Sequence, residues 1–140
     1  MDSYQEPLRP QFHFTALKGW INDPNGLVFQ DGEYHLFFQH NPTGTRWGNL
    51  QWGHAISRDL VHWEQIEEAL APDRFGQMWS GSAVVDWKNT SGLGTGGRPP
   101  IVAVYTATKP WVGKLAVQCM AVSNDRGRTL VKYRGNPVLP

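Results

Sequence analysis

Cysteine, charge and long hydrophobic runs are all scarce in this sequence, and each scarcity excludes a class of protein. The single cysteine among 140 residues, Cys119, excludes an internal disulfide and a zinc site built from cysteines. Its place in an apolar run predicts a small core residue instead. Charged residues make up 18% of the chain, below the usual ~25%.

The charges that are present nearly cancel, with 13 Lys and Arg against 12 Asp and Glu and a net charge of +1. This balance offers no electrostatic attraction for nucleic acid or an anionic membrane, so neither is predicted as a partner. The longest apolar runs, such as Ile101–Tyr105, hold only a few residues, and no segment is expected to cross a membrane. Met1–Gln11 is polar and lacks the hydrophobic region of a signal peptide, which leaves the localisation open.

Tryptophan and strand-like segments are what the sequence has in abundance. Seven residues are Trp, and no stretch keeps a convincing helical period. Asp31-Gly32 between two apolar runs is a hairpin signal. Runs rich in β-branched and aromatic residues predict eight strands: Leu27–Phe29, Tyr34–Phe38, Trp52–Ser57, Val61–Gln65, Ser82–Asp86, Ile101–Tyr105, Leu115–Ser123 and Thr129–Tyr133.

The chain also repeats itself. Ala55–Asp59 returns as Ala121–Asp125 after 66 residues, and Leu36–Phe38 matches Ala103–Tyr105 at an offset of 67. Asp59 and Asp125 end the two copies of the first repeated segment and so hold equivalent positions. This equivalence predicts a structural role in a turn for both.

This repeat predicts an all-β fold made of two four-stranded antiparallel units, at about residues 20–70 and 79–135. Self-similar four-stranded units are typical of β-propeller blades, and propellers close with about 4–8 of them. Two blades cannot close a ring. Their open strand edges therefore predict self-association.

The segment Trp20–Gly26 reads Trp-Ile-Asn-Asp-Pro-Asn-Gly. Six further motifs follow it in order: Phe37–Pro42, Trp47-Gly48, Trp52–Ala55, Asp59–Trp63, Trp79–Asp86 and Ser123–Gly127. Together these seven motifs resemble one enzyme family, glycoside hydrolase family 32, which comprises invertases, levanases and inulinases. The resemblance extends from about Pro10 through the rest of the chain, and the exo-levanase and exo-inulinase branch fits better than the plant invertases.

The resemblance implies part of a five-bladed propeller whose axial funnel cleaves terminal β-D-fructofuranosyl units with retention. Three carboxylates would act there: a nucleophile in Asn-Asp-Pro-Asn-Gly, a stabiliser in Arg-Asp-Pro and a general acid/base in Glu-Cys. The first is Asp23, and the other two motifs are absent from this sequence. The resemblance thus predicts a truncated, N-terminal part of a propeller that is inactive alone.

The family pattern also implies which residues bind the sugar. Asn22, Gln39 and Ser80 match positions that contact the fructosyl unit, and Asn22 and Gln39 could hydrogen-bond its hydroxyl groups. Trp47 and Trp79 would wall the pocket, since an aromatic face suits the apolar face of a sugar. No metal or organic cofactor is implied, because the chemistry needs only carboxylates and water.

Simpler interpretations exist for some of these residues. Asn22–Gly26 read alone favours a turn, because Asp-Pro and Asn-Gly are turn-forming pairs. A turn that opens a strand could still present Asp23 to a funnel. Packing in a core or an interface is the expected role of the remaining tryptophans: Trp52, Trp63, Trp87 and Trp111.

The partner implied by the resemblance is a fructose-containing oligosaccharide or polysaccharide of the sucrose, levan or inulin type. The alternative function is a non-catalytic module that binds fructan or assembles with other blades. The missing carboxylate motifs favour this alternative, whereas the retained nucleophile motif favours the enzyme.

Overall fold

The computed structural model describes residues 4–109 and 115–140. This part of the chain forms strands and loops, and it contains no helix long and apolar enough to span a membrane. The strands are β1 (Trp20–Gln30), β2 (Glu33–Asn41), β3 (Gln51–Ser57), β4 (Trp63–Leu70), β5 (Gln77–Val85), β6 (Ile101–Lys109), β7 (Leu115–Ser123) and β8 (Val131–Lys132).

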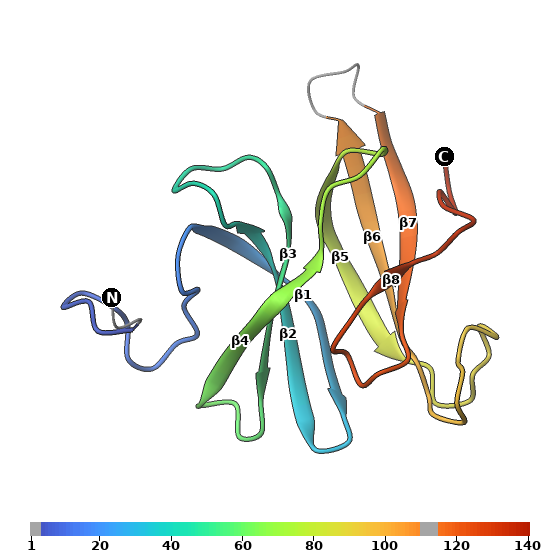
Figure 1. The fold of residues 1–140 in the computed structure, drawn as a ribbon, viewed down its shortest axis with the longest axis horizontal. Coiled ribbons are helices and arrows are strands. Elements are labelled where there is room, and N and C mark those ends of the chain that lie inside the picture. Colours follow the sequence, from blue (N-terminus) through green and yellow to red (C-terminus); the bar gives the residue numbers. More distant parts are fainter. Residues whose placement is uncertain (1–3, 110–114) are drawn as a thin grey trace.

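Two antiparallel sheets, each of four strands in chain order, lie beside each other (Figure 1). Strands β1–β4 form the first sheet and β5–β8 the second, so the predicted all-β pair of four-stranded units is confirmed. Strand β7 has the predicted bounds. Strand β4 was expected at Val61–Gln65 but runs from Trp63 to Leu70, because its pairing with β3 continues to Leu70.

The tight turns follow the sequence signals. Asp31 and Gly32 both have positive φ angles, of 51° and 83°, as a two-residue hairpin turn requires. Asp59 Oδ1 accepts hydrogen bonds from the backbone N–H groups of Val61 and His62. Asp125 Oδ1 accepts in the same way from Thr129, so the predicted structural role of the two repeated aspartates is confirmed.

The main core lies between the two sheets. Phe37 and Trp52 of the first sheet pack with Ala83, Tyr105 and Cys119 of the second. Trp52 is fully buried, and its Nε1–H donates to the backbone oxygen of Trp79 at 2.9 Å across the interface. The predicted core positions of Cys119 and Trp52 are therefore confirmed.

The other packing tryptophans behave differently from one another. Trp63 is half-buried against a smaller cluster that contains Phe38 and the N-terminal Phe14. Trp87 follows β5 in a loop and is 63% exposed, so a core position for it is wrong, and an interface role stays a prediction. Trp111 lies outside the described residues.

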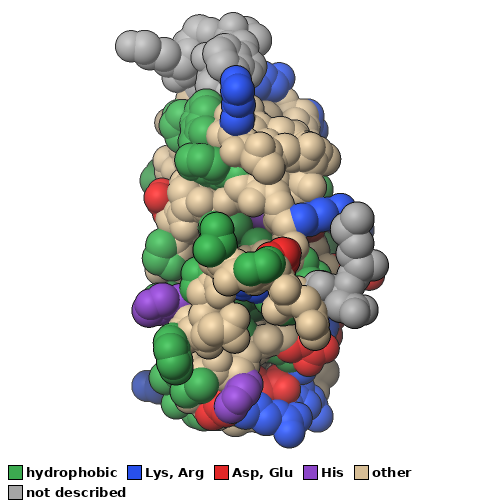
Figure 2. Space-filling view, turned by 90° about the vertical axis from the view of Figure 1, so that its left-hand side faces the viewer, with side chains coloured by type: hydrophobic (Ala, Val, Ile, Leu, Met, Phe, Trp, Pro, Cys, Tyr) green, Lys and Arg blue, Asp and Glu red, His purple; other side chains and the backbone are tan. Residues whose placement is uncertain are grey.

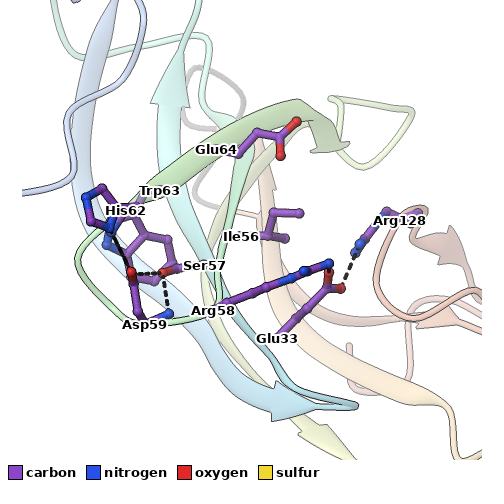
Figure 3. A pocket seen from close by; sticks show the side chains of 9 residues that line it. All are labelled: Glu33, Ile56, Ser57, Arg58, Asp59, His62, Trp63, Glu64 and Arg128. Carbon is purple, nitrogen blue, oxygen red and sulfur yellow. Dashed lines mark hydrogen bonds and ion pairs between the residues drawn. The ribbon is translucent and has the colours of Figure 1, made fainter.

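Charged side chains join the sheets at the end of β1 that lies away from Asp23. The Glu33 side chain is only 6% exposed and lies 2.7 Å from Arg128 in the loop between β7 and β8 and 3.7 Å from Arg58 in the loop between β3 and β4 (Figure 3). A hollow of about 440 Å³ borders these groups, and none of the predicted sugar-binding residues lines it. On the outer face of the first sheet, acidic and basic side chains are interspersed near this end (Figure 2).

Candidate functional site

The predicted nucleophile motif lies inside strand β1 and not in a turn that precedes it. Between the paired positions Ile21 and Pro24, two residues, Asn22 and Asp23, oppose the single residue Gln39 of β2. This is a β-bulge, a device that re-aims side chains and recurs next to active sites. The turn-forming pairs in the motif thus produce an irregular strand, because pairing with β2 continues on both sides.

A second bulge occurs at the corresponding place in the other sheet. Trp79 and Ser80 of β5 lie between the paired positions Met78 and Gly81, opposite the single residue Thr106 of β6. The two sheets therefore use the same local irregularity to turn four side chains toward one region.

One hydrogen bond connects the two bulges, and another holds the first bulge within β1. Ser80 Oγ–H donates to Asp23 Oδ2 at 2.6 Å, and the Trp20 indole N–H donates to Asn22 Oδ1 at 2.8 Å. The bond from Ser80, followed by a side-chain bond from Asn22, lowers the pKa of Asp23 below its usual value. Asp23 is accordingly an exposed, ionised carboxylate near neutral pH, as a nucleophile must be.

All six residues predicted for the site line one pocket of about 250 Å³. Trp47 and Trp79 meet edge to face in its wall, with ring centroids 6.1 Å apart. Within the described part of the chain, Asp23 is the only carboxylate that lines the pocket. The full lining is Asn22, Asp23, Gln39, Trp47, Leu50, Trp79, Ser80 and Thr106.

Polar groups without partners suit this pocket to a polar ligand. Gln39 is buried, and neither its side-chain oxygen nor its nitrogen has a hydrogen-bond partner within the described structure. The indole N–H of Trp79 is likewise unpaired there. Buried polar groups are normally hydrogen-bonded, and a sugar's hydroxyl groups could supply both a donor and an acceptor.

Two lining residues, Leu50 and Thr106, were not expected from the sequence. Thr106 stands 67 residues after Gln39, the same offset as the repeat, so the repeat could have revealed it. Leu50 had no such signal. Its backbone N–H bonds the side chain of Gln77, and its carbonyl accepts from Met78, which draws it to the second sheet.

Replacing Ser80 by Ala is expected to raise the pKa of Asp23, because the strongest bond to its carboxylate is lost. Carbon NMR of the Asp23 carboxyl group through an acid titration measures this change. Any stability that Asp23 contributes is present above its ordinary pKa and is lost as the pH falls through its lowered folded-state pKa. Ser82→Ala, an exposed position on the same strand, is the control, and an unmoved Asp23 pKa would contradict the assigned bond.

Comparison with known proteins identifies the fold and the family. Residues 13–140 match the sequence model of the glycosyl hydrolases family 32 N-terminal domain. The chain is 55% identical over 137 residues to the levanase of Bacillus subtilis (strain 168), covering 98% of this chain and 20% of the levanase.

Solved structures agree with the sequence match. The exo-inulinase of Aspergillus awamori superimposes with a TM-score of 0.90 at 46% identity, over 99% of this chain and 30% of that chain. A fructofuranosidase variant of Schwanniomyces occidentalis complexed with fructosylnystose gives a TM-score of 0.86 at 46% identity, over 94% of this chain and 26% of that chain.

The two sheets are blades of a five-bladed propeller of the kind found in glycosidases. The chain belongs to glycosyl hydrolases family 32, whose N-terminal domain it matches. It spans between a fifth and a third of the length of these relatives.

Proposed function

We propose that this chain is the nucleophile-bearing part of a retaining β-fructofuranosidase. The observation that carries the proposal is the single pocket in which Asp23, Asn22, Gln39, Trp47, Trp79 and Ser80 meet. The unpaired side-chain atoms of Gln39 and the aromatic wall fit a sugar with many hydroxyl groups, and the bond from Ser80 keeps Asp23 ionised.

In the proposed reaction, the Asp23 carboxylate attacks the anomeric carbon of a terminal fructosyl unit. A carboxylic acid protonates the departing oxygen, and water then hydrolyses the fructosyl ester on Asp23 with overall retention. Retaining enzymes hold the two carboxyl groups about 5–5.5 Å apart. We propose that the acid comes from outside these 140 residues, on a further blade, with blade one at about residues 20–70 and blade two at about 79–135.

The proposed substrates are fructose-containing saccharides such as sucrose, inulin or levan. Relatives have been solved with such sugars: the fructofuranosidase variant with fructosylnystose, and a variant of fructan 1-exohydrolase IIa from Cichorium intybus with 1-kestose. The pocket described here provides one end of such a site. The more distant sugar contacts, which set the preference among these substrates, are proposed to lie on other blades.

A chimera tests this function. Residues 1–140 replace the homologous segment of the Bacillus subtilis levanase, to which they are 55% identical, and fructose release from sucrose, inulin and levan is measured. We expect activity, with the β-anomer of fructose formed first. A folded chimera that releases no fructose from any of the three would contradict the proposal.

A second candidate function is a fructan-binding or blade-assembly module without catalysis. It is favoured by one observation, the presence of a single carboxylate among the described residues that line the pocket. The chimera separates the two candidates, because a binding module would bind fructose in calorimetry yet leave the chimera inactive.

The 140-residue chain alone is expected to release no measurable fructose. Loss of general-acid assistance typically costs about 10²–10⁴-fold in rate, and here the proposed stabiliser is absent as well. Incubation with sucrose and inulin, followed by a sensitive fructose assay, checks this expectation. Hydrolysis by the chain alone that disappears in Asp23→Asn would place the acid within these residues.

A further inference from the structure

We propose that His40 is a positioning residue for this pocket: as an imidazolium ion it fastens the start of strand β1, and its deprotonation loosens the bulge that presents Asp23. The inference deepens the proposed function and rests on it for its catalytic consequence. The fastening itself follows from the hydrogen bonds around one buried ring.

The two partners of His40 are both hydrogen-bond acceptors. Its side chain is 1% exposed, with Nδ1 2.7 Å from Glu68 Oε1 of β4 and Nε2 2.9 Å from the backbone oxygen of Lys18. A neutral imidazole has one N–H group and can donate to only one of them. Both bonds form together only if the ring is protonated on both nitrogens or if Glu68 holds the proton, and the higher ordinary pKa of histidine favours the imidazolium.

The charges around the ring support the protonated form. Burial lowers the pKa of His40, but the hydrogen bonds to Glu68 and to the Lys18 carbonyl, with the attraction of the Glu68 carboxylate, raise it above its usual value. The Lys18 ammonium opposes this effect. The residues paired with His40 on the two adjacent strands, Ile21 of β1 and Gln51 of β3, carry no charge.

The ring is placed to act on the nucleophile motif. His40 follows Gln39 of the pocket directly and pairs with Ile21, which immediately precedes the bulge. Its partner Lys18 lies two residues before Trp20, whose indole N–H holds Asn22. The bond from His40 to Lys18 therefore ties the segment before the bulge to β2, and the bond from His40 to Glu68 ties the same ring to β4.

The chain is also held closely at the residue between Lys18 and Trp20. Gly19 has a φ of 86°, and a Cβ atom there would clash with the backbone oxygen of Asn41. The backbone therefore passes directly against β2 at this point. Loss of the bond from His40 to Lys18 would release the segment that leads into the bulge.

The pH dependence follows from the raised pKa. A group whose folded-state pKa is raised stabilises the fold fully below its ordinary pKa, and this contribution is lost as the pH rises through the folded-state pKa. The fastening is therefore complete in mild acid. On the alkaline side the neutral ring keeps a single N–H, which favours the charged Glu68 carboxylate, and the bond to the Lys18 carbonyl is lost. Asp23, whose pKa is lowered, stays ionised across this range.

Nitrogen NMR of the 140-residue chain tests the fastening without any sugar. At pH 6 the ring of His40 is expected to carry protons on both nitrogens. As the pH rises, the signals of the Trp20 indole N–H and the Asn22 side-chain amide should shift with the same midpoint as His40. Glu68→Gln, which keeps the shape of the side chain, should move all these midpoints to lower pH.

A matched control uses the other histidine–carboxylate pair described on the first sheet. His62 Nδ1 lies 2.7 Å from Asp59 Oδ2, but both side chains are exposed and they lie at the β3–β4 turn. His62→Gln should leave the midpoints of His40 and Trp20 unchanged. A singly protonated His40 at pH 6, or Trp20 and Asn22 signals that do not follow its titration, would overturn the proposal.

The catalytic consequence is measured separately in the chimera. Glu68→Gln should move the alkaline limb of its pH–rate profile to lower pH, whereas His62→Gln should not. If the chimera is inactive although His40, Trp20 and Asn22 titrate together, then the proposed function fails and the fastening stands. If the chimera is active and Glu68→Gln leaves the alkaline limb of its pH–rate profile unchanged, then the positioning role fails and the function stands.

Discussion

Asp23→Asn is expected to lower fructose release by the chimera roughly 10⁴- to 10⁶-fold, the range seen when single members of a catalytic group are removed from a well-studied hydrolase. An amide cannot form the fructosyl ester, yet it nearly preserves the size of the carboxyl group and can still accept the hydrogen bond from Ser80. The fold and the pocket should therefore survive while turnover is lost. Steady-state rates on sucrose and inulin measure the effect.

The same substitution elsewhere in the hairpin of β1 and β2 provides the control. Asp31 lies at the tip of that hairpin with a φ of 51°, a conformation that Asn tolerates well. Asp31→Asn should leave the rate of the chimera close to that of its parent. Turnover by Asp23→Asn close to that of Asp31→Asn would remove Asp23 from the role of nucleophile.

Sequence patterns predicted the sheets well because strand periodicity and turn chemistry are local. The hairpin at Asp31-Gly32 and strand β7 follow directly from such signals. Strand β1 begins seven residues before its predicted start at Leu27, because Asn-Asp-Pro-Asn-Gly has the composition of a turn. Its strand character comes from pairing with β2, which no local pattern contains.

The site residues came from the family resemblance, but the reason for their meeting did not. A bulge depends on which residue of the partner strand lies opposite, so the pairings of Asn22 and Asp23 with Gln39, and of Trp79 and Ser80 with Thr106, required the register of both sheets. The repeat offset carried enough information to add Thr106.

Contacts between distant parts of the chain were beyond sequence reasoning. His40 of β2 and Glu68 of β4 are 28 residues apart, and they meet only because β3 pairs with both of these strands. Trp87 was expected to pack in a core or an interface, and its side chain is exposed. The number of tryptophans alone does not say which of their side chains the neighbouring sheet covers.

Trp52→Ala is expected to destabilise the chain by about 3–5 kcal/mol, the usual cost of removing a fully buried large aromatic side chain. Trp52 packs against Phe37 of its own sheet and Tyr105 of the other, with ring centroids 5.7 and 6.1 Å away. Its loss leaves a cavity between the sheets and removes the hydrogen bond to the Trp79 carbonyl. Urea unfolding, followed by circular dichroism, measures the change.

Trp87→Ala is the matched control, because Trp87 is 63% exposed and should change the free energy of unfolding by no more than about 0.5 kcal/mol. The two variants lose the same atoms from different surroundings, so their difference reports the packing between the sheets. Trp52 also holds the backbone of Trp79 in the second bulge, so Trp52→Ala should weaken fructose binding even in urea-free buffer where the variant is folded. Equal stability losses in the two variants would mean that the sheets do not share one core, and the pocket that spans them would then lack its support.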